Sequence, residues 1–254
     1  MRAASARVLL TGASGGIGAA MASALRETGA QVLGVGRGAG SDPAWVQADL
    51  ASPAGRLAVV SAAQRWRPNV VVMAAGLPGF GRLEDLPPEQ LERVLQLNLL
   101  APMLLTQTLL PQLRAQGHTQ LIFVGSALGR IGLPGFSLYG ASKAGLHGFA
   151  EALRRELADT TVRVQLLAPR ATRTAFNSAA VDAYNERTGS ASDTPETVAK
   201  ALVELLQSEA AERFIGFPER LGVRVNGLLG PLLDGSFAKH RRSLAELPAN
   251  AITT

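Results

Sequence analysis

Three residues near the middle of the chain have the side chains and spacing that proton transfer requires. Tyr139 and Lys143 lie four residues apart, so a helix would place them on one face, one turn from each other. A free tyrosine ionises at about pH 10, and a nearby cation favours the phenolate and lowers that pKa. Ser126 follows the apolar run 121–125, which predicts a buried strand, and its hydroxyl could bond the same substrate oxygen. Tyrosine and lysine also occur at this spacing by chance, so the prediction of a catalytic group depends on the rest of the chain.

A glycine-rich turn follows the first apolar stretch of the chain. Residues 8–10 predict a short buried strand, and a helical pattern runs from about Ile17 to Glu27. Glycines between them allow a tight turn and close approach of the backbone to a pyrophosphate. Free N–H groups and the dipole at the start of the helix favour negative charge, whereas the alternative, a flexible loop, is disfavoured by the flanking elements. The residues expected to bind a dinucleotide here are Gly12, Ser14, Gly16, Ile17 and Gly18.

The second predicted strand covers residues 31–36, and Arg37 follows it. In dinucleotide-binding folds an acidic residue at this point bonds the ribose 2′-hydroxyl of NAD, whereas a nearby arginine accommodates the 2′-phosphate of NADP. This chain has Gly36 where the acid would stand, and then Arg37. The pattern favours NADP(H); the alternative is an ordinary arginine in a solvated loop.

Other small or polar residues also follow predicted strands. Asp49 and Leu50 come after the third strand, where the carboxylate could accept a hydrogen bond from an adenine amino group or simply begin a turn. Ala75 ends the fourth strand, which is wholly apolar as a central parallel strand should be, and the backbone at Gly76 could pass close to a ligand.

A long helical stretch from about Pro87 to Arg114 carries a polar residue among leucines. Asn98 lies in its middle, followed by Pro102, which must disturb the helix. A buried asparagine needs hydrogen-bond partners. Asn98 is therefore interpreted either as a polar group that stabilises a kink or as a group on the ligand side.

Predicted strands and helices alternate along the whole chain. Further strands are expected at 45–48, 121–124, 162–167 and 213–216, and further helices at 52–66, 139–158 and 195–208. The polar segment 176–192 is expected to be irregular and to act as a mobile lid. We therefore predict one α/β domain with a doubly wound, Rossmann-like parallel sheet of about seven strands and helices on both faces. Ligands of such sheets bind at the carboxyl ends of the strands, where all these residues fall.

Composition excludes several classes of function. The chain has 254 residues, of which 47% are hydrophobic and 18% charged, and it has no cysteine, so disulfides and cysteine nucleophiles are excluded. Three scattered histidines make a metal site an unfavoured interpretation. The net charge of +5 is spread along a chain with few aromatic residues, which does not indicate nucleic-acid binding. No segment is expected to span a membrane, and we predict a cytoplasmic protein.

These motifs together resemble the short-chain dehydrogenase/reductase family of the compact, single-domain type, over about residues 7–215. Thr11-Gly12-x-x-x-Gly16-x-Gly18 is similar to the family's cofactor turn, and Asp49-Leu50 to its adenine contact. The resemblance implies a catalytic tetrad that consists of Asn98, Ser126, Tyr139 and Lys143. By that analogy the tyrosine exchanges the substrate proton and the serine polarises the carbonyl oxygen. The lysine lowers the tyrosine pKa and binds the nicotinamide ribose, and the asparagine holds a water linked to the lysine.

The resemblance also completes the expected cofactor site. Its members are Gly12, Ser14, Gly16, Ile17, Gly18, Arg37, Asp49, Leu50, Ala75, Gly76, Asn98, Tyr139, Lys143, Pro169, Thr172 and Thr174. Two stretches depart from the family pattern: Met73-Ala74-Ala75-Gly76 replaces Asn-Asn-Ala-Gly, and Pro169-Arg170 replaces Pro-Gly. Arg170 could recognise an anionic substrate, contact a cofactor phosphate, or point to solvent.

The C-terminal part of the chain departs from the family as well. Residues 1–216 are predicted to form the catalytic domain, and 217–254 an apolar and basic extension. The extension interleaves Val223, Val225, Leu228, Leu229, Leu232, Leu233 and Phe237 with Arg220 and Arg224, followed by Lys239-His240-Arg241-Arg242. It could pack on the domain or on a second subunit, lie on a membrane surface with its basic side toward the headgroups, or cover a lipid-like substrate.

The favoured hypothesis is an NADP(H)-dependent oxidoreductase that transfers a hydride between the nicotinamide and a carbonyl or secondary alcohol. The apolar C-terminus suggests a hydrophobic ketone or a 3-oxoacyl-type substrate. The alternative from another class is a catalytically silent NAD(P)-binding sensor or scaffold, but both Tyr139 and Lys143 are present. An epimerase or dehydratase with the same tyrosine base would need a longer C-terminal substrate domain. The expected partners are a small-molecule substrate and a second or further copies of the chain, as a homodimer or homotetramer.

Overall fold

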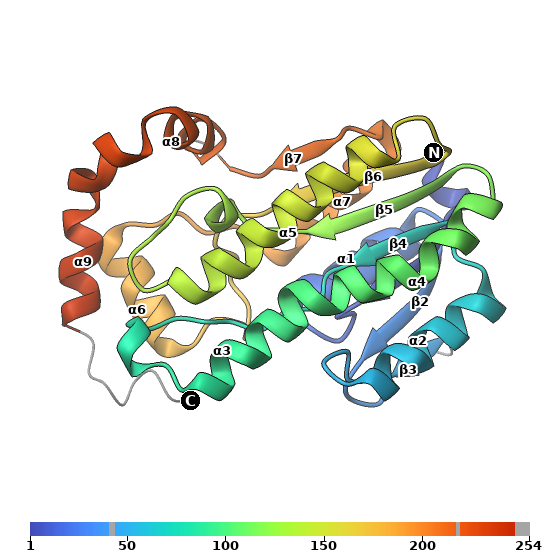
Figure 1. Ribbon diagram of the computed structural model, residues 1–254, viewed down its shortest axis with the longest axis horizontal. Helices are drawn as coiled ribbons and strands as arrows, with labels where there is room; N and C mark the ends of the chain where they lie inside the picture. Colours follow the sequence, from blue (N-terminus) through green and yellow to red (C-terminus); the bar gives the residue numbers. More distant parts are fainter. Residues whose placement is uncertain (41–43, 217–218, 247–254) are drawn as a thin grey trace.

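The computed structural model describes residues 1–40, 44–216 and 219–246, and a seven-stranded parallel sheet forms its centre (Figure 1). The strand order is β3-β2-β1-β4-β5-β6-β7, so the chain winds outward from β1 in one direction and from β4 in the other. The strands are β1 (Arg7–Thr11), β2 (Gln31–Gly36), β3 (Trp45–Gln47), β4 (Val70–Met73), β5 (Thr119–Val124), β6 (Val162–Ala168) and β7 (Glu212–Phe214). The predicted doubly wound, Rossmann-like sheet in a single domain is confirmed.

Helices cover both faces of this sheet. They are α1 (Gly16–Glu27), α2 (Pro53–Trp66), α3 (Pro88–Leu95), α4 (Ala101–Ala115), α5 (Ser137–Glu156), α6 (Ala179–Thr188), α7 (Pro195–Ser208), α8 (Glu219–Leu233) and α9 (Ala238–Ala245). Short turns of other helix types are η1 (Ala3–Ser5), η2 (Leu83–Asp85), η3 (Gln96–Leu100), η4 (Ala127–Gly129) and η5 (Asp234–Phe237).

Alternation of side chains along the strands divides the core into two apolar layers. Leu9 of β1 packs in the layer that α2, α4 and α5 cover, whereas Val8 and Leu10 pack in the layer under α1 and α7. Because both faces are buried, β4 is apolar throughout, and β1 and β5 each contain an unbroken apolar run rather than an alternation with polar residues. The apolar run at β4 therefore predicts its central position correctly.

Local capping fixes where α2 and α7 begin. The Ser52 hydroxyl accepts a hydrogen bond from the Gly55 amide at 3.0 Å, and Thr194 accepts one from the Thr197 amide at 3.3 Å. A proline occupies the first helical turn in both helices, where its missing N–H costs nothing.

The long helical stretch after residue 87 is divided by a π-helical turn. Pro102 has no N–H to donate to the carbonyl four residues earlier, and the backbone widens over η3, where the Ala101 amide bonds the Gln96 carbonyl five residues before it. Pro88–Ala115 is also the one stretch of the described chain whose length and composition would suit a membrane span, contrary to expectation. Its residues Leu105, Leu109 and Leu113 are buried in the core.

The prediction that residues 176–192 are irregular is wrong. This segment contains α6, which Ser178 caps by accepting a hydrogen bond from the Val181 amide at 3.4 Å and which ends at Gly189, with φ +74°. The helix is short, and its polar surface obscured the pattern, although the serine and glycine at its ends are ordinary boundary signals.

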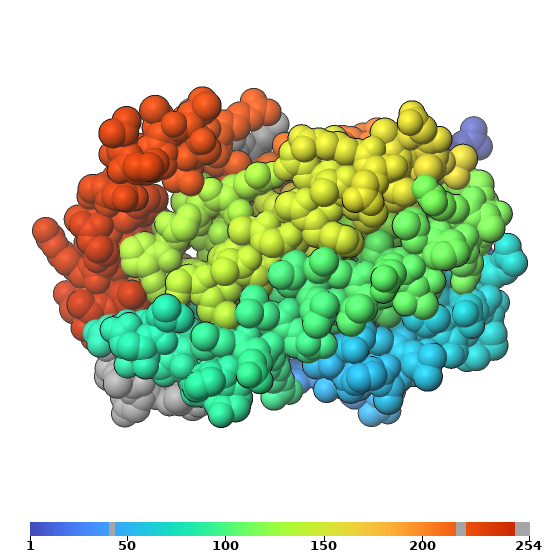
Figure 2. All heavy atoms as spheres, in the orientation of Figure 1, coloured from blue at the N-terminus to red at the C-terminus, as the bar shows by residue number. Residues whose placement is uncertain are grey.

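The predicted C-terminal extension forms α8, η5 and α9, while residues 217–218 and 247–254 lie outside the described part. Helix α9 lies against α6, and the rings of His240 and Tyr184 are 5.8 Å apart. Figure 2 shows this segment, in red, at one end of the molecule beside the yellow-green residues that precede α5. The outer face of α8 exposes Leu228 and Leu232, which are 84% and 80% accessible.

The turn between β1 and α1 depends on close backbone contacts. Gly12 has φ +74°, and a Cβ there would lie 2.8 Å from the Cα of Ala75, two residues after β4. A Cβ at Gly18, in the first turn of α1, would overlap the Gly12 carbonyl oxygen. Both glycines are therefore required for the strand, the turn and the helix to pack together.

Gly18→Ala should lower the free energy of unfolding by about 1–3 kcal/mol, because the added methyl must displace backbone rather than a flexible side chain. Gly148→Ala is the matched control: it lies in α5 with nothing near the new Cβ, and should raise the free energy of unfolding by about 0.5–1 kcal/mol. Urea unfolding of both variants measures the difference, and equal stability would contradict the close-packing argument.

Candidate active site

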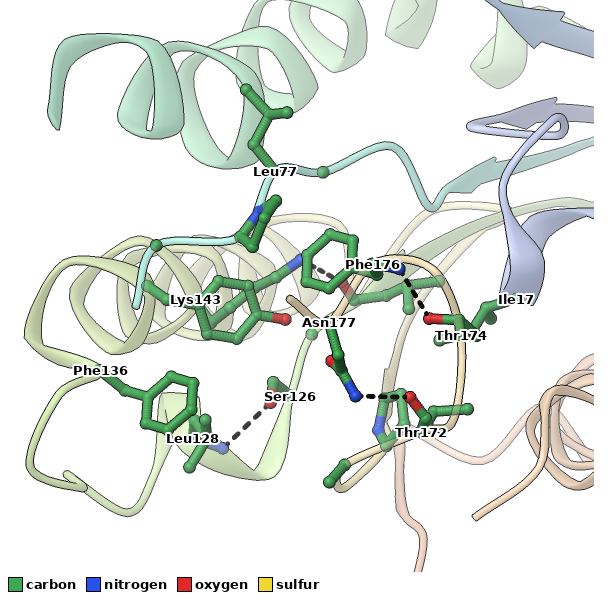
Figure 3. A pocket seen from close by; sticks show the side chains of 18 of the residues that line it. Ile17, Leu77, Ser126, Leu128, Phe136, Lys143, Thr172, Thr174, Phe176 and Asn177 are labelled. Atoms are coloured by element: carbon green, nitrogen blue, oxygen red, sulfur yellow. Dashed lines mark hydrogen bonds between the residues drawn. The ribbon is translucent and has the colours of Figure 1, made fainter. Parts of the chain in front are cut away.

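A cavity of about 1020 Å³ runs along the carboxyl edge of the sheet. Its wall includes the β1–α1 turn, the ends of β2, β4, β5 and β6, the start of α5, and parts of α6, α8 and α9. Figure 3 shows Ile17, Thr174, Ser126 and Lys143 around this space, contributed by four separate regions of the chain. Every residue of the expected cofactor site except Asn98 lines the cavity.

The glycine turn forms one end of the cavity. Helix α1 starts at Gly16, and no side-chain hydrogen bond caps it at Gly15, so its first amides are directed to the cavity end without a capping group. A Cβ at Gly16 would lie 2.7 Å from the Thr174 methyl, which places Thr174 directly against the turn. Backbone N–H donors and the absence of bulky side chains make this end suitable for binding a pyrophosphate.

Arg37 is exposed at the carboxyl end of β2 and lines the same end of the cavity. A side chain at Gly36 would meet the Ser14 hydroxyl at 2.8 Å and the Trp45 ring, so this position has no room for an acidic residue. Asp49 also lines the cavity, and its carboxylate accepts a hydrogen bond from the Ala51 amide at 3.0 Å. Asp49 thus begins a turn, the second of the two interpretations, and still borders the cavity.

Tyr139 and Lys143 occupy successive turns of α5, as their spacing predicts. The Lys143 Nζ lies 5.7 Å from the centroid of the Tyr139 ring and donates a 3.0 Å hydrogen bond to the Val124 carbonyl at the end of β5. Ser126 follows Val124 by two residues and is buried at the cavity wall. Its hydroxyl bonds Tyr139. The predicted group of three is therefore brought together at one wall.

Burial, rather than the lysine, dominates the proton affinity of Tyr139. The apolar wall raises the pKa of the Tyr139 phenol to about 12, an effect that the Ser126 hydrogen bond opposes. Burial also lowers the pKa of Lys143 to about 8, because a charged ammonium is costly away from water. The expectation that Lys143 lowers the tyrosine pKa is not met here: the lysine is only weakly held in its charged form and is turned toward Val124.

Asn98 lies behind the cavity wall rather than on it. It is fully buried in η3, where its Oδ1 accepts from the Leu77 amide at 2.7 Å and its Nδ2 donates to the Leu77 carbonyl at 3.0 Å. The Nδ2 also donates to the Ser142 hydroxyl at 3.1 Å, one residue before Lys143. The side chain thus ties the loop after β4 to α5 across the π-helical turn, which favours the structural interpretation of this residue. Its expected role through a bound water stays a prediction.

Arg170 lines the cavity and does not simply point to solvent, whereas its expected roles toward an anionic substrate or a cofactor phosphate stay predictions. Its guanidinium forms a two-point ion pair with Asp193, with Nε–Oδ2 at 3.0 Å and the second contact at 2.8 Å. The side chains of Arg170 and Asp193 are only 17% and 10% exposed. The sequence offered no signal for this pair, because its members are separated by a segment that contains α6.

His147 is a further residue of the site that the sequence analysis did not select. It lies one turn after Lys143, and its Nε2 accepts a 3.4 Å hydrogen bond from the Ser126 amide. Burial, with smaller contributions from Arg130 and Lys143, lowers its pKa to about 3, so the ring is neutral and can accept. A side chain at Gly125 would overlap this ring. The four-residue spacing from Lys143 was the available signal.

The opposite end of the cavity is mostly apolar. Its wall there is formed by Phe80, Leu128, Ile131, Leu133, Phe136, Phe176, Val181, Val225, Leu233 and Phe237. The Phe176 ring lies 6.0 Å from the Tyr139 ring in an edge-to-face arrangement. Sequence reasoning placed at the substrate only those in the segment 176–192 and in the C-terminal extension; the positions of the others depend on how separate loops meet.

Comparison with known proteins agrees with this geometry. Residues 6–185 match the family model of short chain dehydrogenases. The chain is 36% identical over 189 residues to the oxidoreductase claN of Passalora fulva, covering 67% of this chain and 84% of that protein. It is 29% identical to the 3-oxoacyl-[acyl-carrier-protein] reductase FabG of Escherichia coli, over 80% of this chain and 90% of that protein.

Two solved structures are similar as well. A short chain dehydrogenase from Burkholderia cenocepacia in complex with NADP superposes with a TM-score of 0.81 at 24% identity, covering 94% of this chain and 99% of that one. The 3-ketoacyl-(acyl-carrier-protein) reductase from Brucella melitensis complexed with NADH gives 0.74 at 25% identity, over 85% and 98% of the two chains. The chain belongs to the short-chain dehydrogenase family, and it is an NAD(P)-dependent oxidoreductase.

Tyr139 should remain a neutral phenol through about pH 10, where half of a free tyrosine is ionised. Because folding raises this pKa to about 12, the group's contribution to stability is complete below about pH 10 and is lost as the pH rises toward 12. Ultraviolet titration of tyrosinate in the folded protein and in urea measures this, and Tyr139→Phe identifies the signal. A midpoint below 10 for Tyr139 would show that Lys143 outweighs burial.

Proposed function

We propose that the protein is an NADP(H)-dependent reductase that acts on the carbonyl group of a hydrophobic ketone or 3-oxoacyl-type substrate, with the secondary alcohol as the product. The observation that carries this is the position of Tyr139, Ser126 and Lys143 at one wall of the cavity. They lie between a glycine turn at one end and an apolar wall at the other. A dinucleotide and an apolar substrate placed in that order would meet beside the tyrosine.

The residues present fit a nicotinamide dinucleotide. A side chain at Gly12 would meet the Ala75 backbone and one at Gly18 would overlap the Gly12 carbonyl, so glycines keep the turn free of side chains at these positions. The first amides of α1 lie at that end without a side-chain cap. The turn and Thr174 would hold the pyrophosphate, and Asp49 and Leu50 would border the adenine. When bound, the nicotinamide supplies or accepts the hydride.

Each catalytic side chain has a role that its surroundings allow. Tyr139 is a neutral phenol at physiological pH, so it is in the form that donates a proton to the substrate oxygen as the carbonyl is reduced. Ser126 can donate a second hydrogen bond to that oxygen and stabilise its developing negative charge. Lys143 lies behind the ring, and its remaining donors can bond a ribose hydroxyl. A neutral His147 supports the backbone at Ser126.

The preference for NADP(H) rests on the end of β2. Arg37 is exposed at the cavity there, and the space beside it is filled by Trp45 and Ser14, which leaves no room for a carboxylate at position 36. Similar proteins bind either cofactor, since one solved relative holds NADP and another NADH. The arginine is therefore the specific support for the 2′-phosphate in this chain.

The substrate class rests on the apolar end of the cavity. Leu128, Phe136 and Val225 are among the residues that line it, and the similarity to a 3-oxoacyl-[acyl-carrier-protein] reductase agrees with an acyl-type substrate. An apolar chain of this kind would gain about 25 cal/mol for each Å² of surface removed from water.

The partners and location remain proposals of the same kind. A homodimer or homotetramer is supported by Leu95 and Leu100, which are 40% and 41% exposed. Peripheral membrane contact is supported by Leu228 and Leu232, which are exposed on α8, and by the exposed Arg224 on the same helix. Cosedimentation with anionic vesicles tests the membrane contact, and unchanged binding of Leu228→Ser/Leu232→Ser would contradict it.

We propose a cytoplasmic location for the catalytic domain, residues 1–216.

Arg37→Ala should weaken NADPH binding by about 1–3 kcal/mol and leave NADH binding nearly unchanged, because only the 2′-phosphate loses a charge-assisted hydrogen bond. Titration of protein fluorescence with each cofactor measures the two dissociation constants. Arg65→Ala, an exposed arginine in the last turn of α2, is the control and should affect neither. An equal loss for NADPH and NADH would remove the argument for NADP.

The reaction is tested by NADPH consumption with carbonyl compounds from small polar ketones to long-chain 3-oxoacyl thioesters. Turnover should rise with chain length, and Tyr139→Phe should reduce kcat by about 10²–10⁴ while NADPH binding persists. Thr108→Val is the control, because it also removes one hydroxyl, which bonds the Leu104 carbonyl at 3.0 Å on the exposed side of α4. Saturable NADPH binding without turnover of any carbonyl would favour the sensor or scaffold alternative.

A further inference from the structure

Between β6 and α7 the chain leaves the body of the domain and returns to it; we call residues 174–191 the excursion, and the two stretches at its base, 170–173 and 192–193, its foot. The ion pair between Arg170 and Asp193 lies in this foot. Arg170 follows β6 by two residues, and Asp193 immediately precedes Thr194, which caps α7. The Nε and a terminal nitrogen of the arginine meet the two carboxylate oxygens at 3.0 Å and 2.8 Å, the two-point geometry that gives such pairs their strength and direction. The pair therefore links two points that are anchored in the body of the domain.

Backbone hydrogen bonds close the same foot. The Asp193 amide donates to the Ala171 carbonyl at 2.8 Å, and the Arg173 amide donates to the Asp193 carbonyl at 3.0 Å. Thr172 and Asp193 form an isolated parallel bridge, and the Arg173 guanidinium reaches the Ser192 hydroxyl at 3.1 Å. The chain thus leaves the body at 170–173 and returns to it at 192–193, with the two strands of the foot held together.

The excursion between these points carries groups that border both halves of the cavity. Thr174 lies against Gly16 of the cofactor turn, and Phe176 lies edge-to-face with Tyr139. Figure 3 shows Thr172, Thr174, Phe176 and Asn177 along one continuous loop of this segment. Further along, Tyr184 of α6 is fully buried and donates to the Pro134 carbonyl. The positions of all these groups depend on where the foot of the excursion is held.

We propose that Arg170 and Asp193 are a positioning pair that holds the foot of this excursion closed and so sets Thr174 and Phe176 against the cofactor turn and Tyr139. The inference rests on the proposed function for its kinetic consequences and deepens it. The Asp193 carboxylate takes up two donors of the guanidinium and offsets its charge, so the pair acts first as a link between the two ends of this segment. Removing either partner leaves the other charge largely buried and uncompensated, which favours opening of the foot.

Four variants test the pair: Arg170→Ala, Asp193→Asn, the reciprocal double variant Arg170→Asp/Asp193→Arg, and Arg213→Ala as the control. Arg213 forms an exposed ion pair with Glu204 away from the cavity, and its loss should have little effect. Asp193→Asn preserves the shape of the side chain, so it remains informative if Arg170→Ala fails to fold. Each variant is measured for the rate of chymotrypsin cleavage after Phe176, the NADPH dissociation constant, and kcat and KM separately.

Both single variants should accelerate the cleavage at least tenfold and weaken NADPH binding three- to tenfold. They should lower kcat more than they raise KM, because Tyr139 loses its neighbour Phe176. The reciprocal double variant should recover each value to within about threefold of the wild type, since the ion pair is restored with its members exchanged. Arg213→Ala should match the wild type throughout.

Two results would overturn the proposal. If Arg170→Ala raised KM for anionic substrates alone while Asp193→Asn was unimpaired, the arginine would bind substrate directly. If both single variants kept wild-type cleavage rates and NADPH affinity, the pair would not hold the foot. Cleavage and cofactor binding need no turnover, so a failure of the proposed carbonyl chemistry would leave these readouts intact and is distinguished from a failure of the pair.

Discussion

The strands of the described sheet all pair in parallel, and the position of the site follows from this constraint. Parallel strands direct their carboxyl ends to one edge, so the turn after β1, Arg37 after β2 and Ser126 after β5 meet along one cavity although they are distant in sequence. Parallel pairing also requires both faces of the sheet to be covered, which is why α1 and α7 pack on one side and α2, α4 and α5 on the other. The site is thus assembled at the edge of the sheet, where loops can vary without disturbing the buried layers.

Burial sets the electrostatics at the catalytic wall. Tyr139 and Lys143 both move toward their neutral forms, with pKa values of about 12 and about 8, and His147 stays neutral with a pKa of about 3. The wall supplies these groups with hydrogen bonds: the Val124 carbonyl accepts one from Lys143, and the Ser126 amide donates one to the neutral His147 ring. The phenol is therefore held in its protonated form at neutral pH.

The ion pair of Arg170 and Asp193 contrasts with this neutral wall. Two opposite charges are retained near the cavity, where they satisfy each other at two contacts and join β6 to the start of α7. The helix that they bracket, α6, is fixed on its far side by contacts with α9 and by the Tyr184 hydroxyl. The segment that forms this side of the substrate end is thus held at its base by the ion pair and at α6 by these contacts. The C-terminal segment covers one side of it.

The sheet and most of the residues at its carboxyl edge could be predicted from the sequence alone. Apolar runs such as the one at β4 predict buried strands, and the glycine turn and the four-residue step from Tyr139 to Lys143 are local signals that need no tertiary information. Other features depend on contacts between distant segments and could be seen only in the tertiary structure. These are the contact of Arg170 with Asp193, the position of Phe176 beside Tyr139, and the position of Asn98 behind the cavity wall. The tertiary structure also decided the proton affinity of Tyr139, because spacing shows that a lysine is near but not how much water the fold removes.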